Sequence, residues 1–211
     1  MKAVVYHTDA SIANNFPKDT YKKLLIGLRK NCNEFNIPLI HITINGYPGY
    51  GNENIFVDAD PEDITHNREK FFIELLKLAK DDEVFYFTEP DSRINKMFPP
   101  LTVDAAFLFR SGEHTITPAW RLAKRSALPI FEEAFSYYNT STADWGRDTL
   151  AWKKLCDNIE NPKLGIVDYN GLKIDLRRYK DYCFRRRSGY VSQFKANSKR
   201  DLIEQDKLNE A

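Results

Sequence analysis

Two carboxylates separated by a proline, Glu89 and Asp91, directly follow a hydrophobic stretch, residues 83–88. If this segment stays extended, side chains at i and i+2 point to the same face, so both carboxylates would enter one site. Hard cations such as Mg²⁺ and Mn²⁺ bind one or two carboxylates together with substrate phosphate oxygens. The pair therefore predicts a metal site that holds a diphosphate. The alternative is that Pro90 ends the strand and that both acids are solvated turn residues or helix caps.

A second acidic pair, Asp144 and Asp148, lies one helical turn apart at the start of an amphipathic stretch. A carboxylate at such a position can act as a general base that accepts the proton of an attacking hydroxyl group. It can also cap the helix and stabilise the positive end of the helix dipole, without any catalytic role. Both interpretations stay open, and Asp148 is the preferred candidate for the base.

The charge of the chain is unevenly distributed along the sequence. Its 31 Lys and Arg residues nearly balance 30 Asp and Glu residues, which gives a net charge of +1. Residues 173–200, however, hold ten basic and two acidic side chains, interleaved with aromatic residues. This pattern favours contact with nucleic acid; neutralisation of a substrate diphosphate and a solvated basic surface are the alternatives. The candidate nucleic-acid-binding residues are Arg177, Arg178, Arg185, Arg186 and Arg187.

Alternating strand and helix patterns position these residues. The sequence predicts strands over residues 2–8, 37–44 and 83–88, separated by amphipathic helices that begin near Pro17 and Asp63. This alternation is typical of an α/β fold with a mostly parallel, mixed central sheet and helices on both faces. Ligands of such sheets bind outside the carboxyl ends of the strands, where both Glu89 and Asp91 lie. Further strands are expected at 105–110 and 119–123, and further helices at 128–138 and after Asp148.

Composition excludes several classes of protein. With 42% hydrophobic and 13% aromatic residues, the 211-residue chain can form a substantial core, which a disordered chain cannot. Its three cysteines lack the spacing of a zinc site or a disulfide framework, and no apolar run has the length of a signal peptide or membrane span. We therefore expect a cytoplasmic protein. Residues 1–172 are expected to form the catalytic domain, and residues 173–211 a basic, aromatic-rich segment packed on or beside it.

The arrangement of elements and the acidic pair at residues 89–91 resemble nucleotide-sugar-dependent glycosyltransferases of the GT-A fold, over roughly residues 2–160. The segments 117–120 and 144–148 resemble a later strand and an acceptor-facing helix of that family. The resemblance implies a UDP-sugar donor and a divalent metal, Mn²⁺ or Mg²⁺, bound by Glu89 and Asp91. The donor-binding residues that it implies are Tyr6, His7, Thr8, Arg68 and Lys70.

Two departures from the family pattern concern the metal site. Glu89 replaces the first aspartate of the family's acidic motif, and a proline stands in the middle of that motif. No histidine follows His114, so the C-terminal histidine ligand common in the family has no counterpart. Either Asp168 or Asn170 replaces it, or the enzyme holds no tightly bound metal.

The resemblance and the basic segment together predict transfer of a sugar from a nucleotide diphosphate sugar to a hydroxyl group. The favoured acceptor is a hydroxymethylated base of phage DNA, modified in the host cytoplasm. A base in a duplex would have to flip out of the stack to react. A saccharide, lipid or protein acceptor is the alternative, as is a noncatalytic nucleic-acid-binding protein.

Overall fold

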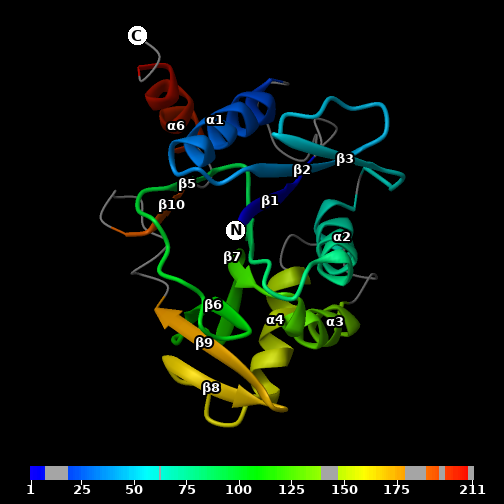
Figure 1. The fold of residues 1–211 in the computed structure, drawn as a ribbon, viewed down its shortest axis with the longest axis vertical. Helices are drawn as coiled ribbons and strands as arrows, with labels where there is room; N and C mark the ends of the chain where they lie inside the picture. The colour runs from blue at the N-terminus through cyan, green and yellow to red at the C-terminus, as the bar shows by residue number, and fades with distance from the viewer. Residues whose placement is uncertain (8–18, 62, 139–146, 179–188, 195–197, 209–211) are drawn as a thin grey trace.

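The computed structural model describes residues 1–7, 19–61, 63–138, 147–178, 189–194 and 198–208. Its strands are β1 (Lys2–Tyr6), β2 (Leu39–Ile44), β3 (Glu53–Val57), β4 (Phe85–Thr88), β5 (Ser92–Ile94), β6 (Ala105–Arg110), β7 (Thr115–Ala123), β8 (Gly165–Tyr169), β9 (Leu172–Arg178) and β10 (Val191–Gln193). Eight of them form one mixed sheet in the order β3-β2-β1-β4-β7-β6-β9-β8 (Figure 1). The four strands β3, β2, β1 and β4 run parallel to one another, and β9 runs parallel to β6. β7 is antiparallel to both of its neighbours, and β5 pairs with β10 in a separate small sheet.

Helices cover both faces of this sheet, which confirms the predicted fold class. They are α1 (Thr20–Glu34), α2 (Ile64–Leu78), the 3-10 helix η1 (Arg125–Ala127), α3 (Leu128–Ser136), α4 (Arg147–Asn158) and α6 (Ser198–Leu208). Because successive side chains of a strand point to opposite faces, Ala3 and Val5 pack with residues of α1, whereas Val4 and Tyr6 pack with residues of α2, α3 and α4. The two faces of β1 are thus buried in two separate hydrophobic clusters.

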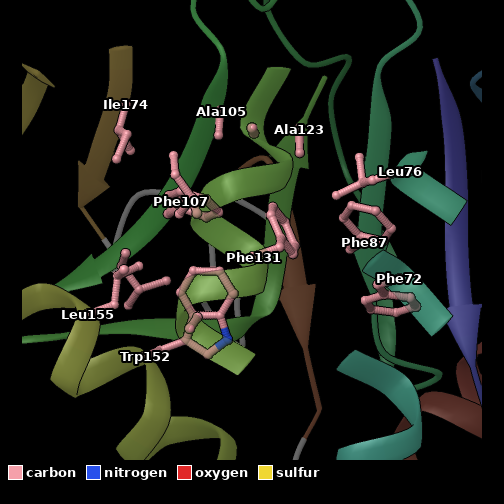
Figure 2. Close-up of a cluster of buried hydrophobic side chains, with 14 of the residues drawn as sticks. Phe72, Leu76, Phe87, Ala105, Phe107, Ala123, Phe131, Trp152, Leu155 and Ile174 are labelled. Carbon is pink, nitrogen blue, oxygen red and sulfur yellow. The ribbon is translucent and has the colours of Figure 1, made fainter. Parts of the chain in front are cut away.

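The larger cluster is rich in aromatic rings, several of which Figure 2 shows. Phe131 of α3 and Trp152 of α4 meet edge to face with ring centroids 5.4 Å apart, and Phe72 of α2 stacks on Phe87 of β4 at 4.4 Å. Such pairs are attractive beyond the area that they bury. This packing fixes the positions of α2 and α4 relative to β4. The candidate residue Arg68 lies on α2, Asp148 lies on α4, and β4 leads into Glu89.

The C-terminal helix α6 packs against α1, as the red and blue helices of Figure 1 show. Leu202 of α6 belongs to one hydrophobic cluster with Tyr21 and Leu24 of α1, and Asp206 pairs with Arg93 of β5 at 2.6 Å. Gly27 of α1 lies beside this ion pair, so that a Cβ atom on residue 27 would overlap both the carboxylate and the guanidinium group. The absence of a side chain at Gly27 therefore permits the close approach of α6 to α1.

The expected elements are present, with ends shifted by a few residues. The strand expected over 105–110 is β6, and the one expected over 119–123 begins earlier, at Thr115. β9 was not expected, and it is an interior strand between β6 and β8. The domain boundary expected between residues 172 and 173 therefore falls within β9, so that the first part of the basic segment belongs to the central sheet. No helix within the described ranges is long and apolar enough to cross a membrane.

Candidate active site

The end of β1 directs two candidate donor-binding residues to opposite faces of the sheet. Tyr6 stacks on Phe71 of α2 with centroids 5.8 Å apart, and burial raises the pKa of its hydroxyl to about 12. His7 lies on the other face, 4.0 Å from the ring of Tyr21. Burial, together with the nearby charges of His41, Lys199 and Arg68, lowers the pKa of His7 to about 3, so its imidazole is neutral at pH 7. The third candidate, Thr8, lies outside the described residues.

The segment Glu89–Asp91 is a turn, which confirms the alternative that Pro90 ends the strand; the extended conformation required for the paired metal site is wrong. The N–H of Ser92 donates to the carbonyl oxygen of Glu89 at 3.1 Å, which is the i to i+3 bond of a β-turn. Pro90 presets the backbone for the second position of such a turn. The two carboxylates consequently have different neighbours, because the rule that i and i+2 share a face applies only to a strand.

Each carboxylate of this turn is bound by a basic side chain. Glu89 accepts hydrogen bonds from Arg68 at 3.0 Å and from the side-chain amide of Gln193. Asp91 is 5% exposed, and one of its oxygens lies 3.3 Å from the ammonium group of Lys199. Although burial opposes the charged form of Lys199, the carboxylate and the neighbouring Tyr21 raise the pKa of this lysine. Sequence reasoning missed both Gln193 and Lys199 as members of this site.

Arg68 is the centre of a charge cluster, which we define as the buried residues Arg68, Glu69, Arg121 and Asp148 together with the half-buried Glu89. Its Nε donates to Glu69 at 3.1 Å, one terminal nitrogen donates to Glu89, and the other donates to Asp148. Despite the penalty of burial, these three carboxylates raise the pKa of Arg68, which keeps its charge. Lys70, the other basic residue implied for this helix, is exposed, with its ammonium group 5.5 Å from the ring of Phe71.

The second arginine of the charge cluster, Arg121 of β7, is fully buried. It forms two hydrogen bonds with Glu69, of 2.5 and 2.9 Å. Its guanidinium carbon lies 5.1–6.0 Å from four aromatic rings, which are those of Phe72, Phe87, Phe131 and Trp152. Burial of Glu69 opposes its ionisation, but the two arginines outweigh this effect and lower its pKa. In the sequence, a charged residue within a largely apolar strand indicates that Arg121 is buried and paired, and this signal was missed.

Asp148 lies in the first turn of α4 and is 5% exposed. One carboxylate oxygen accepts from Arg68, and the other accepts from the backbone N–H of Thr149 at 2.6 Å. Burial raises the pKa of Asp148, and the neighbouring Glu69 and Glu89 raise it further against the opposing effect of Arg68. Asp148 is therefore both hydrogen-bonded at a helix start and a stronger proton acceptor than a solvated aspartate. Asp144 lies outside the described residues.

The acidic pair does not fit the two-carboxylate metal site expected from the sequence. Glu89 and Asp91 point to different partners from a turn, and both already pair with protein cations. Asp168 and Asn170 belong to the hairpin of β8 and β9 at the far edge of the sheet, where Asp168 accepts from the N–H of Gly171 at 3.0 Å. In the described ranges, no three or more His, Cys, Asp or Glu side chains are grouped as metal ligands.

The predicted nucleic-acid-binding arginines fall partly within the described structure. The side chain of Arg177 is 10% exposed, pairs with Asp175 at 2.7 Å and lies 5.7 Å from the ring of Trp120. Arg178 at the end of β9 is exposed. Arg185, Arg186 and Arg187 lie outside the described residues, so that among the five predicted residues Arg178 is the one that the described structure places on the surface.

Comparison with known proteins identifies the fold. The sequence matches no protein-family model and no curated protein. Among solved structures, a glycosyltransferase involved in glycosylation of the major capsid of PBCV-1 is similar with a TM-score of 0.57 and 9% identity, over 99% of this chain and 100% of that one. An active-site mutant of LgtC gives 0.56 and 12%, and the galactosyltransferase LgtC with donor and acceptor sugar analogues gives 0.52 and 9%; both cover 99% of this chain and 96% of theirs. The chain therefore has a GT-A-like fold.

Proposed function

We propose that this protein transfers a sugar from a nucleoside diphosphate sugar to a hydroxyl group. The observation that carries the proposal is the meeting of Arg68, Glu89 and Asp148, from three separate elements, beside the carboxyl end of β4. This end of an open α/β sheet is where ligands bind. Sugar transfer is also the activity named for the similar structures, one of which holds donor and acceptor sugar analogues.

In the proposed reaction, Asp148 is the proton acceptor. The acceptor oxygen forms a bond to C1 of the sugar while the bond from C1 to the diphosphate oxygen breaks, and the nucleoside diphosphate leaves with the bonding electrons. The acceptor proton passes to Asp148, whose raised pKa suits a general base. Arg68 holds the carboxylates of Asp148 and Glu89 in fixed positions, which limits the reorganisation needed during transfer.

For the donor, we propose a uridine nucleotide bound at the ends of β1 and β4. His7 and Tyr21 form a ring pair at the end of β1, and the imidazole stays neutral. A neutral imidazole can both donate and accept a hydrogen bond, as recognition of a base requires. Tyr6, Thr8 and Lys70 stay predicted donor-binding residues.

For the acceptor, a hydroxymethylated DNA base stays our prediction, supported by the basic composition of residues 173–200 and by the exposed Arg178. Arg177 does not support it, because its side chain is covered and paired with Asp175. A saccharide, lipid or protein acceptor is the alternative, and the similar PBCV-1 protein is described as acting in glycosylation of a capsid. Both acceptor classes therefore belong in the assay.

The test is a turnover assay by mass spectrometry. Wild-type protein is incubated with a panel of nucleotide sugars and with hydroxymethylated DNA, oligosaccharides and denatured protein as acceptors. Asp148→Asn is expected to lower the transfer rate by about 10²–10⁴ fold, the usual contribution of a general base. The control is Asp157→Asn, which removes an exposed carboxylate from the same helix and should leave the rate unchanged. The proposal fails if no nucleotide sugar is consumed and no nucleoside diphosphate raises the melting temperature.

A further inference from the structure

We propose that the ammonium group of Lys199 takes the place of a divalent metal ion at Asp91, so that the protein binds a nucleoside diphosphate without a metal. The inference rests on the proposed function, since it concerns the cation that accompanies the donor. It follows from the failure of the acidic pair to fit the expected metal site.

Asp91 already has a cation beside it, the ammonium group of Lys199. Its carboxylate is 5% exposed and lies 3.3 Å from Nζ of Lys199. The same ammonium group donates to the hydroxyl of Tyr21 at 3.3 Å and lies 5.1 Å from the centre of its ring. A metal ion at Asp91 would have to displace this ammonium group from a buried, aromatic-lined position, which breaks an ion pair and a cation–π contact.

Glu89 cannot join Asp91 around one ion without further losses. One of its oxygens accepts from Arg68 and the other from Gln193. Arg68 in turn donates to three carboxylates of the charge cluster, so its displacement would leave buried charges unpaired. A metal held by both acids would thus require the removal of two protein cations that the fold has fixed in place.

Lys199 is held in place by the rest of helix α6. Leu202, about one turn further along the helix, packs in one hydrophobic cluster with Tyr21 and Leu24, and Asp206 pairs with Arg93 at 2.6 Å. Gly27 permits this close contact. A lysine on an exposed helix would lose side-chain freedom when it bound a phosphate, whereas Lys199 has already lost it on folding.

Each acid of the turn already has a protein cation beside it. Lys199 pairs with Asp91, and Arg68, which also pairs with Glu69 and Asp148, pairs with Glu89. Lys199 presents a compact positive charge with several N–H donors, which is the chemistry that binds phosphate oxygens. The protein would therefore supply from its own C-terminal helix the cation that a metal ion supplies elsewhere.

The experiment is isothermal titration of the full chain with UDP, ADP, GDP and CDP, in EDTA and again in Mn²⁺. We expect one of these nucleotides to bind with a Kd that differs by less than about threefold between the two conditions. In EDTA, Lys199→Gln should weaken binding at least tenfold, and Lys199→Arg should retain most of it. The matched control is Arg200→Gln, which removes a positive charge from an exposed neighbour on the same helix and should leave the Kd unchanged.

Each other outcome has a definite meaning. Binding that occurs only in Mn²⁺ would overturn the inference and leave the proposed function intact, and so would unchanged binding by folded Lys199→Gln in EDTA. If no nucleoside diphosphate binds in either condition, the proposed function fails together with the inference. Because the comparison of EDTA with Mn²⁺ uses wild-type protein, it stays decisive even if a Lys199 variant does not fold.

Discussion

The buried pair of Arg121 and Glu69 allows a sharp test of the charge cluster. Arg121 has no exposed surface and Glu69 is 3% exposed, and two hydrogen bonds join them. We compare three proteins, which are Arg121→Met, Glu69→Met and the double variant. Methionine is flexible and apolar, so that it can fill much of the volume of either side chain.

The single change Arg121→Met should lower the free energy of unfolding by about 3–5 kcal/mol, because it leaves the Glu69 carboxylate buried with one of its two arginines missing. The double variant removes both charges, and replacement of a whole buried pair by apolar side chains is often neutral or stabilising. It still deprives Nε of Arg68 of its acceptor, which costs about 1–3 kcal/mol. The double variant should therefore be more stable than Arg121→Met, by about 2 kcal/mol.

Urea unfolding at pH 7, followed by circular dichroism, measures these differences, provided that the slope of free energy against urea stays constant. The exposed pair Arg125–Asp81, joined at 3.8 Å, provides a control cycle that should show a coupling below about 1 kcal/mol. If Arg121→Met loses less than about 1 kcal/mol, or if the double variant is no more stable than the single one, the charges are not buried as described.

Three further predictions follow from other parts of the structure. The pKa of His7 is about 3 in the folded protein and 6.5 in the unfolded chain, so protonation favours unfolding below pH 6.5. The free energy of unfolding should therefore be about 2 kcal/mol lower at pH 5 than at pH 8. His7→Gln should reduce this pH dependence, as measured by urea unfolding. Gly27→Ala should disrupt the ion pair of Asp206 and Arg93, whose side-chain ends the new Cβ atom would overlap; this lowers the melting temperature and weakens nucleotide binding in titration, although alanine favours a helix by about 1 kcal/mol. Trp152→Ala should lower the free energy of unfolding by about 3–5 kcal/mol through the cavity left in the aromatic core.

A specific result would contradict each of these three predictions. A pH profile that is the same in wild type and in His7→Gln would show that another group titrates. Gly27→Ala with wild-type stability would mean that the side chains of Asp206 and Arg93 rearrange without cost, and Gly112→Ala, at a position with open space around it, serves as its control. A loss of less than about 1 kcal/mol in Trp152→Ala would mean that neighbouring rings refill the site.

Hydrophobic periodicity predicted β1, β2, β4, α1 and α2 because these elements are buried in regular patterns. β2 is buried along its whole length and was expected, whereas the edge strand β3 has an exposed, irregular pattern and was missed. The hairpin of β8 and β9 carried a usable signal. Asn170 and Gly171 have positive φ angles of 54° and 81°, as an Asn-Gly two-residue turn requires, yet this segment was interpreted as a possible metal site.

The site was only partly predictable from the sequence. Glu89, Arg68 and Asp148 were identified from motif positions, and the structure brings these three together. Arg121, Gln193 and Lys199 come from distant elements, and no local pattern shows which residues they contact. Glu69 adjoins Arg68 on α2 and was not identified. The turn at Glu89–Asp91 agrees with the alternative interpretation of the sequence, in which Pro90 ends the strand, and not with the extended segment that a shared metal site requires.

The pairing of Tyr21 with Lys199 joins residues 178 positions apart, and it has a consequence for synthesis of the protein. The chain emerges from the ribosome N-terminus first, at about 5–20 residues per second, and domains tend to fold as they emerge. Every strand of the eight-stranded sheet precedes residue 179, so the sheet can form while α6 is still being made. A partly synthesised chain would then hold Asp91 without Lys199, and a nucleotide site that depends on this lysine would be completed only by the last helix.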